Sequence, residues 1–476
     1  MTDKMKKKRI WWLIVILAGL LVLYFLPHSS RELINAQTGL KAENVQLITP
    51  LSAKLFAPFL DFPFYFYNFA EPKLQLSSWL IWFLAIWLIV GVIKLHPHLS
   101  PPPWRGRIKG EGMRLLRGVI VIIVSFLLFV LYLFLFPLPQ YSLKTENPNE
   151  IFLDLHSHTI YSHDGSATLE RSILWHLNCG FDGWATTEHN WIGAAPIAQE
   201  EMLRKNSIDG FVIPGEEINF NGSHINALGI KKDVNKNHYK TLSDLVKAVH
   251  RQKGAVIVPH FWGKEKPPLS LEDLAKVGVD GFEIAGYSSR PLKPKLKKEI
   301  IALCKKQGLV MVGGTNWHGW GSFCDVWTGF RIDNWQKLNK KARKKTILEA
   351  LRKREVSKFR VITYPKKFYT KSHYVFEPFI GTFSYLCSLN NWQRISWFFW
   401  LLIICSFLRL IKDKRQIAIF LWLLVSLILI AKGISFLNTY QMVNTVNNIL
   451  PGASRWLFLM AIATLLLAIT NKKERR

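Results

Sequence analysis

Cysteine is scarce in this chain of 476 residues, and its cysteines are scattered. No two of them are spaced as a CxxC pair: they are Cys179, Cys304, Cys324, Cys387 and Cys405. The spacing excludes a zinc site of the paired-thiolate kind and gives no sign of a disulfide framework. The cysteines therefore neither require nor exclude an oxidising compartment.

Acidic residues are also few. The chain has 33 Asp and Glu against 62 Lys and Arg, for a formal net charge of +29. Such an excess has two common causes, which are nucleic-acid binding and Lys/Arg clusters at the cytoplasmic ends of membrane spans. Many of the basic residues lie beside apolar runs, which favours the second cause. Because the excess continues in the middle of the chain, an anionic ligand or membrane surface stays open as a partner.

Long apolar runs gather near both ends of the chain, and a membrane span needs roughly 20 mostly apolar residues. We expect about six spans: 10–26, 79–93 and 119–136, then 397–411, 417–430 and 456–469. The first run could instead be a signal peptide, but no clear small-residue cleavage site follows it. Residues 374–389 contain Glu377 and Pro378, so we expect an interfacial or packed segment there. If this segment spans the membrane, the C-terminal half has four spans instead of three, and the chain end falls on the opposite side.

These runs predict a membrane region at 1–140, a middle domain at 141–370 and a second membrane region at 371–476. Basic clusters occupy the short links after the second and fourth spans and both chain ends. With three spans on each side of the middle domain, all four clusters fall on one face, which should be cytoplasmic. The chain is therefore expected to be an integral, multi-pass protein of a bacterial-type inner or plasma membrane. Its middle domain is expected to be extracytoplasmic.

The middle domain alternates between strand-like and helix-like segments. Seven short strands are expected at 151–155, 183–187, 211–214, 225–229, 255–258, 281–284 and 309–312. Helices are expected between several of them, including 169–178, 242–252 and 296–306. The alternation predicts a parallel α/β sheet or barrel.

Potential ligand residues follow these strands in order. The first strand is followed by His156 and His158, the second by His189, the third by Glu217, the fifth by His260, and the seventh by Asn316 and His318. Functional groups at the carboxyl ends of successive strands are typical of a TIM-like barrel. His224 departs from the pattern because it precedes its strand.

The residue types indicate metal chemistry. His156 and His158 are two residues apart on extended chain, so both imidazoles point to one side. Imidazole suits Zn, Mn and Fe, and carboxylates such as Asp164 and Glu217 can bridge two ions. Water held between two such ions is a nucleophile near neutral pH, which suits hydrolysis of phosphate esters. A lone histidine is usually a surface or packed residue, but here five separate elements each end in His or Glu.

Six short motifs together resemble the PHP (polymerase and histidinol phosphatase) family. They are DLHSHT at 154–159, SHDG at 162–165, TEH at 187–189, PGEE at 214–217, VPH at 258–260 and GTNWH at 314–318. The resemblance covers about residues 150–362, and ILEALR at 347–352 resembles the helix that commonly closes that domain. It implies a distorted (β/α)7 TIM-like barrel with two or three divalent ions of Zn, Mn or Fe.

The resemblance also implies how the ligands divide among three metal positions. His156, His158, Glu217 and Asn316 would hold the first ion. Glu217 would be shared with a second ion bound by His224 and His260. The third would take His189, His318 and either Asp164 or His163. Asp164 is preferred because the Asp-Gly turn matches better, which leaves His163 as a candidate for proton transfer beside the site.

The sequence departs from the family pattern at two positions. Asn316 stands where the family usually has Asp, and its amide oxygen can coordinate an ion but brings no charge. The first ion should therefore bind more weakly, or activate water less. Glu188 replaces the Asp that usually precedes the histidine at 189, and we expect a smaller effect there.

Other residues are candidates for substrate contacts. Arg290 follows the sixth strand and could grip a phosphate bidentately, or be a surface arginine. Glu283 could enter the pocket or stay inside the barrel with a partner. The tryptophans near the active face could stack on a substrate or wall the cleft: Trp262, Trp317, Trp320 and Trp327. His176 and His250 lie in helical stretches and are not expected to be ligands.

Three functions are compatible with these residues. The favoured one is a membrane-tethered, metal-dependent phosphoesterase acting on a phosphorylated small molecule, lipid headgroup or glycan. The second is a noncatalytic metal-binding sensor or scaffold, in which Asn316 in place of the usual Asp is a sign that catalytic activity has been lost. The third, nucleic-acid processing, is least favoured because nothing else in the chain resembles a polymerase or a nucleic-acid module.

Overall fold

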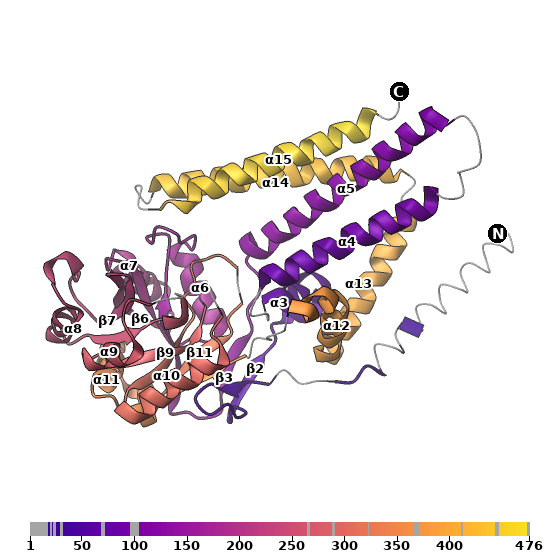
Figure 1. The fold of residues 1–476 in the computed structure, drawn as a ribbon. Helices are drawn as coiled ribbons and strands as arrows, with labels where there is room; N and C mark the ends of the chain where they lie inside the picture. The colour runs from indigo at the N-terminus through magenta and orange to yellow at the C-terminus, as the bar shows by residue number, and fades with distance from the viewer. Residues whose placement is uncertain are drawn as a thin grey trace.

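The computed structural model describes residues 18–19, 21, 25–28, 32–67, 72–95, 104–263, 267–287, 291–321, 323–364, 371–410, 413–442 and 447–473. An α/β region lies at one end of the molecule, and a group of long helices extends away from it (Figure 1). Most of the first expected span, 10–26, lies outside the described residues, as does Arg290.

The α/β region is built on a ten-stranded sheet of order β1-β12-β11-β4-β5-β6-β7-β8-β9-β10. Its strands are β1 (Ile34–Asn35), β4 (Glu150–Ser157), β5 (Gly183–His189), β6 (Phe211–Phe220), β7 (Ser223–Leu228), β8 (Ala255–Val258), β9 (Gly281–Gly286), β10 (Val310–Gly314), β11 (Val326–Arg331) and β12 (Phe359–Thr363). A separate two-stranded sheet pairs β2 (Val45–Ile48) with β3 (Ser142–Thr145).

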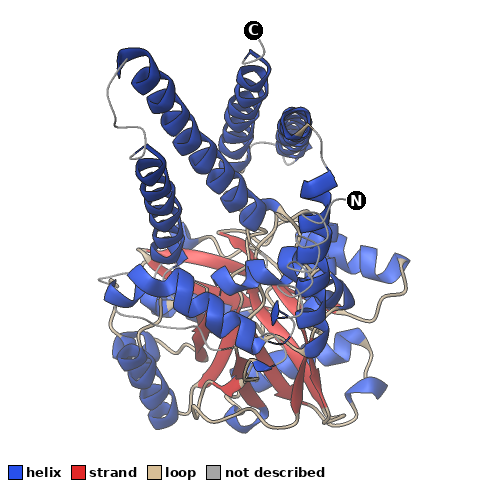
Figure 2. Cartoon of the chain, turned by 90° about the vertical axis from the view of Figure 1, so that its right-hand side faces the viewer, coloured by secondary structure: helices blue, strands red, loops and turns tan. Residues whose placement is uncertain are grey.

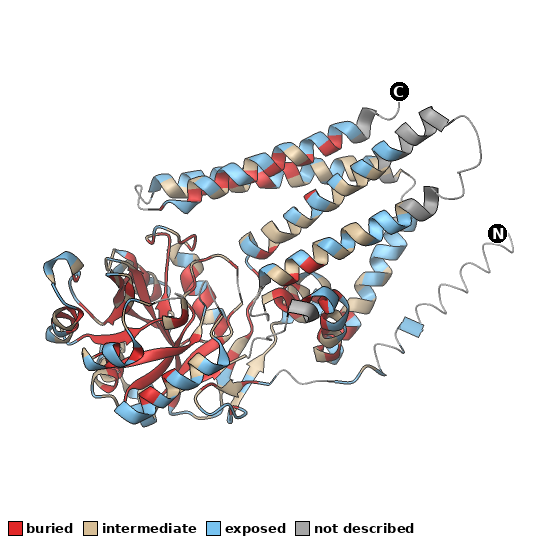
Figure 3. Cartoon of the chain, in the orientation of Figure 1, coloured by how far each residue is buried: buried red, intermediate tan, exposed pale blue. Residues whose placement is uncertain are grey.

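The large sheet curls so that the chain leaving β10 returns to β4. The backbone N–H of Thr315 donates to Asp154 Oδ1 at 3.0 Å. The N–H of Asn316 donates to the carbonyl oxygen of His156 at 2.8 Å. The result is a mixed α/β half-barrel, consistent with the expected TIM-like barrel, with buried strands inside a layer of helices (Figures 2 and 3).

Six α-helices surround or follow the strands. They are α6 (Leu169–Cys179), α7 (Ala195–Lys205), α8 (Leu242–Arg251), α9 (Leu271–Lys276), α10 (Pro294–Gln307) and α11 (Lys340–Arg352). Amphipathic spacing and N-caps explain their positions: Thr168, Thr241 and Ser270 each accept a hydrogen bond from the first turn of α6, α8 and α9. Each of the seven expected strands has a counterpart among β4–β10.

The expectation of a parallel sheet is wrong at β7, which runs antiparallel to both of its neighbours, β6 and β8. β6 and β7 form an antiparallel hairpin with no helix between them, and Glu217 pairs with Asn226. The hairpin turns at Asn221-Gly222, which have φ of 49° and 88°. Asn-Gly suits such a turn because both residues tolerate positive φ. The hairpin explains why His224 reaches the site: it lies at the start of β7, paired with Asn219 near the end of β6.

Strands outside the expected set extend the sheet. β1 pairs antiparallel with β12, so a segment that precedes the long helix at 72–95 contributes to the α/β region. β11 pairs antiparallel with both β4 and β12. The expected boundary at residue 141 leaves β1 and β2 on the membrane side of the division, although both pair with strands of the middle domain.

Asp182 joins β4 to the start of β5. Its Oδ2 accepts from Phe152 N at 2.8 Å, and burial raises its pKa to about 6. Because this carboxyl binds its proton more tightly when folded, its contribution to stability is present below about pH 4 and lost as the pH rises to about 6. Asp182→Asn should therefore raise the free energy of unfolding, relative to wild type, by about 1–2 kcal/mol more at pH 8 than at pH 5. Thermal unfolding of the full chain at both pH values measures this, and an equal offset would contradict it.

Four described helices are long and apolar enough to cross a membrane. They are α4 (Pro72–Leu95), α5 (Trp104–Leu135), α14 (Lys414–Met442) and α15 (Ile449–Lys473). They contain the expected spans 79–93, 417–430 and 456–469, and α5 covers 119–136 except for its last residue. Much of their apolar surface is exposed to the surroundings, as in Figure 3. α14 is longer than expected because the apolar pattern resumes after Lys432 and Gly433.

Two further long helices are not among these four. α13 (Asn391–Leu410) overlaps the expected span 397–411 but is not among the four that meet the length and hydropathy requirements in the described part of the chain. α12 (Lys371–Ser388) covers the expected packed segment, and Glu377 inside it is buried and accepts a hydrogen bond from the Tyr65 hydroxyl. Short turns complete the chain: α2 (Leu51–Leu55), η1 (Ala57–Asp61), α3 (Phe62–Tyr67), η3 (Lys236–His238), η4 (Phe261–Gly263), η5 (Trp335–Lys337) and η6 (Val356–Lys358).

Candidate metal centre

The end of β4 places two imidazoles and the β6 carboxylate in one small triangle. His156 and His158 are fully buried, and their Nε2 atoms are 3.1 Å apart. Glu217 Oε2 lies 3.4 Å from His156 Nε2 and 3.3 Å from His158 Nε2. Ligand atoms about 2.0–2.1 Å from a tetrahedral ion are separated by roughly 3.3 Å. The three atoms therefore have the spacing of ligands around one ion.

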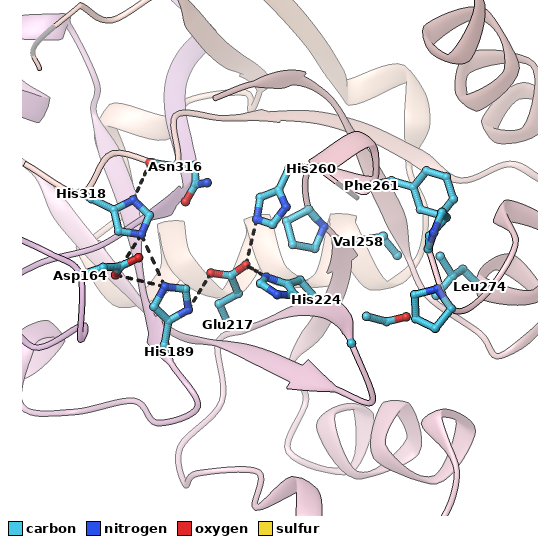
Figure 4. Close-up of a pocket in the computed structure, with 16 residues that line it drawn as sticks. Asp164, His189, Glu217, His224, Val258, His260, Phe261, Leu274, Asn316 and His318 are labelled. Atoms are coloured by element: carbon cyan, nitrogen blue, oxygen red, sulfur yellow. Dashed lines mark hydrogen bonds and ion pairs between the residues drawn. The ribbon is translucent and has the colours of Figure 1, made fainter. Parts of the chain in front are cut away.

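The other oxygen of Glu217 faces a second pair of imidazoles. Oε1 is 2.6 Å from His224 Nδ1 and 2.9 Å from His260 Nε2 (Figure 4). The two carboxylate oxygens thus face different histidine pairs, which is the geometry of a bridging ligand. The resemblance to the PHP family implies the same sharing.

A third triangle lies beside the first. Asp164 Oδ1 is 3.3 Å from His189 Nε2 and 3.3 Å from His318 Nε2, and the two imidazole nitrogens are 3.5 Å apart. His189 also connects this group to the first, because its Nδ1 is 3.1 Å from Glu217 Oε2. His158, His189 and His318 are close enough to form a group as well, so the residues can be divided among ions in more than one way.

Three oxygens in these groups are buried without a hydrogen-bond partner: Glu217 Oε2, Asp164 Oδ1 and Asn316 Oδ1. Buried polar atoms are normally satisfied, so each such oxygen needs an explanation. Asn316 uses its amide nitrogen to donate to Tyr287 O at 3.3 Å, and its side chain lies in the cavity (Figure 4). Oxygens of this kind surrounded by imidazoles fit divalent cations. The residues present therefore fit the implied metals, including the uncharged Asn316.

The pKa shifts of Glu217 and His156 are those expected of groups that bind a cation. Burial opposes the charged form of Glu217, but His156, His158 and His189 outweigh it and hold its pKa well below the usual range. Burial likewise opposes protonation of His156, yet the carboxylates of Glu283 and Glu217 raise its pKa to about 10. The buried carboxylate thus attracts positive charge, which protons supply on the histidines when no metal ion does.

Two buried carboxylates hold the ligands from behind. Glu283 accepts from His156 Nδ1 at 2.8 Å and from His260 N at 2.8 Å, so it lies inside the barrel with partners rather than in the pocket. Glu188 binds the backbone N–H of Thr159 and the hydroxyl of Ser162, whose oxygen lies 2.9 Å from His158 Nδ1. A hydrogen bond to the second ring nitrogen fixes which nitrogen faces the metal. The sequence pattern did not identify Ser162 because a lone serine has no ligand signature.

Replacing Glu283 by glutamine is expected to weaken metal binding about 10–100-fold. A carboxylate accepts from both His156 Nδ1–H and His260 N–H, whereas an amide offers one oxygen and turns N–H groups toward the other donor. Competition with a chelator measures the affinity. Glu299→Gln, an exposed change on α10, is the matched control and should have no effect. Equal affinities for Glu283→Gln and wild type would contradict this role.

The other sequence candidates are distributed differently. His163 is 51% exposed, with Nδ1 3.9 Å from Asp164 Oδ1, so it lies beside the third triangle. Trp262, Trp317 and Trp327 are buried, and Trp317 stacks on Trp175 at 4.3 Å. Those three pack within the walls and are not in position to stack on a substrate.

The two helical histidines, which were not expected to be ligands, contact other carboxylates. His176 contacts Asp154, and His250 contacts Asp280. A hydrogen bond to a carboxylate is a common structural role for a buried or half-buried histidine.

The cavity over the metal residues has a volume of about 230 Å³. Its far wall is apolar and includes Phe261, Pro267, Pro268 and Leu274. The sequence did not predict this wall, because Phe261, Pro267 and Pro268 follow β8 in a segment with no periodic pattern. The volume is below the roughly 300–1,000 Å³ of typical small-molecule pockets, so the cavity suits a small group rather than a whole large ligand.

No protein-family model matches this chain. No curated protein matches it either. Among solved structures, it is similar to a two-domain protein from Bacteroides vulgatus containing a predicted PHP-like metal-dependent phosphoesterase, with 20% identity and a TM-score of 0.34 over 44% of this chain and 64% of that one. It is also similar to an amidohydrolase from Chromobacterium violaceum with bound sulfate and no metal, with 16% identity and a TM-score of 0.29 over 35% of this chain and 87% of that one. Likenesses this distant carry no argument, so the account of the site rests on its own geometry.

Proposed function

We propose that the chain is a membrane-tethered hydrolase that uses two or three divalent ions to cleave phosphate esters. The observation that carries the proposal is a set of three buried oxygens without a hydrogen-bond partner, on Glu217, Asp164 and Asn316. The first two lie 3.1–3.4 Å from imidazole nitrogens. A purely structural histidine cluster would satisfy such oxygens with hydrogen bonds. The cavity above them leaves room for a small anionic group.

Bound divalent ions would supply a water of lowered pKa and would neutralise charge on the phosphoryl oxygens. The chain itself does the positioning. Glu217 directs one oxygen to each of two histidine pairs, and Asp164 directs one to a third. His163, exposed beside Asp164, is the group proposed to move a proton to or from the leaving group. Arg290 is proposed to bind the phosphate from the end of β9.

The proposal includes an extracytoplasmic α/β region. The end of α4, the start of α5, the end of α13 and the start of α14 all lie remote from the α/β region (Figure 1). Basic residues cluster in the sequence at and between these helix ends, and such clusters favour the cytoplasmic side. A topology reporter fused near residue 200 tests this, and a cytoplasmic signal would overturn it.

The direct test of the proposed activity uses the full chain in detergent or nanodiscs. Metal is removed with a chelator, and the protein is reloaded with Zn, Mn or Fe before assays on generic phosphate monoesters and diesters. We expect hydrolysis to disappear with the metal and to return with at least one of these ions. Tight metal binding without turnover of any ester in the screen would reject the proposed activity.

One observation favours a second function, a noncatalytic metal-binding sensor or scaffold. Asn316 offers an uncharged oxygen where a carboxylate would give an ion and its water a stronger field. In that case the wild-type chain should bind metal without turnover, and Asn316→Asp should create activity. If wild type is already active and Asn316→Asp does not improve it, the sensor function is rejected.

A further inference from the structure

Asn447 and Asn448, just before α15, lie against the loop that carries Asp164. Asn447 is fully buried. Its Nδ2 donates to the backbone carbonyl oxygens of Ile160 at 3.3 Å, Ser162 at 3.0 Å and Gly165. A side chain from between two membrane-type helices thus binds three points of the metal-site loop.

The same side chain also begins α15. Asn447 Oδ1 accepts from the backbone N–H groups of Ile449 and Leu450, both at 3.1 Å. Asparagine is suited to both tasks because its amide offers donors on one side and an acceptor on the other. The next residue adds a further contact, since Asn448 N donates to the carbonyl oxygen of His163 at 2.7 Å.

A second contact holds the loop from the other side. Trp320 Nε1 donates to the carbonyl oxygen of Asp164 at 2.7 Å, and its ring packs edge-on against Phe436 of α14 at 5.8 Å. The following residue, Gly321, donates its N–H to Phe134 O at the end of α5. Both loops that supply the third triangle therefore contact the ends of long helices.

The loop needs these donors because its turn is tight and largely buried. A Cβ on Gly165 would lie 1.9 Å from the carbonyl oxygen of Thr159, so the backbone closes on itself there. A buried carbonyl oxygen in such a turn destabilises the fold unless it accepts a hydrogen bond. The hairpin that supplies the donor is itself tightly packed: Ser454 Oγ donates to Gly433 O at 2.9 Å, and Ser426 and Thr464 share a hydrogen bond at 2.6 Å.

We propose that Asn447 is a positioning residue, through which the α14–α15 hairpin holds Asp164 against His189 and His318 and so sets the affinity of the third metal position. The inference rests on the proposed metal-dependent function. It makes the membrane helices part of the metal centre, since a shift of the hairpin relative to the α/β region moves the loop that carries Asp164.

The test compares Asn447→Asp with Asn448→Asp in the full chain in nanodiscs. The first change keeps the oxygen that caps α15 but removes the donor and puts a carboxylate against three carbonyl oxygens. The control adds the same charge one residue later, on an exposed side chain whose loop contact is made by the backbone. Co²⁺ titration, followed by visible absorption and elemental analysis, counts the ions and ranks their affinities.

Asn447→Asp is expected to weaken one of the bound Co²⁺ ions, assigned to the third position, by about tenfold or more, with the other ions and the control unchanged. Trp320→Phe keeps the ring against Phe436 and removes only the bond to Asp164, so it should weaken the same ion by a smaller factor even if Asn447→Asp does not fold. Wild-type affinities in both variants, or equal losses in Asn448→Asp and Asn447→Asp, would overturn the inference. The expected loss of Co²⁺ affinity in Asn447→Asp, together with a wild-type chain that hydrolyses no ester, would instead reject the proposed function and leave the inference standing.

Discussion

Replacing Glu217 by glutamine is expected to lower metal-dependent hydrolysis by on the order of 10³-fold, about 4 kcal/mol of transition-state stabilisation. Glu217 is the carboxylate whose two oxygens face separate histidine pairs. An amide carries no charge, and its nitrogen cannot coordinate an ion, so one pair would lose its oxygen ligand. Activity and metal content of the full chain, measured on the same sample, check the result.

The neighbouring carboxylate is the matched control. Glu216 is also buried, but its Oε2 accepts from Val234 N at 2.9 Å on the side away from the histidines. Glu216→Gln retains an oxygen for that bond, so metal content and activity should stay near wild type. Loss of metal in both variants would show that any buried charge change here disrupts the fold, and would contradict a specific role for Glu217.

Replacing His158 by alanine is expected to abolish measurable hydrolysis, also on the order of 10³-fold. His158 is fully buried at the centre of the cluster, stacked 4.0 Å from His318 and 4.5 Å from His189, with Nε2 facing Glu217. Its loss removes a ligand and leaves a cavity between the two triangles. Assays with each reloaded metal measure the effect, and His238→Ala, at an exposed histidine outside the cluster, is the control. Activity that survives His158→Ala would contradict its assignment as a ligand.

Much of the fold was predictable because its signals are local. Apolar β-like runs at 151–155 and 255–258 are short and bounded by turn residues, and the structure places β4 and β8 there. Their carboxyl ends meet at one edge of the sheet, so His156 and His260 could be placed together from order alone. The antiparallel β6–β7 hairpin was missed, although Asn221-Gly222 is a recognisable signal for it.

The rest depends on contacts between distant parts of the chain, which leave no periodic pattern. The pairing of β1 with β12 joins segments more than 300 residues apart. Asn447 reaches Ser162 across 285 residues, and nothing about an asparagine after a membrane span indicates that partner. The sequence did not decide whether the Glu283 side chain lies in the pocket or inside the barrel, because its two partners, His156 and His260, lie at or just after the ends of other strands.

The central claim is that Glu217 joins a multinuclear metal centre, and the most direct measurement is the metal content of the purified full chain. Wild type and Glu217→Gln are equilibrated with Zn and Mn, freed of unbound ions and analysed for metal per chain. The geometry predicts more than one tightly held ion in wild type and a clear loss in Glu217→Gln, with Glu216→Gln unchanged. A wild-type chain that retains no divalent metal, or a Glu217→Gln chain that retains as much as wild type, would contradict the account.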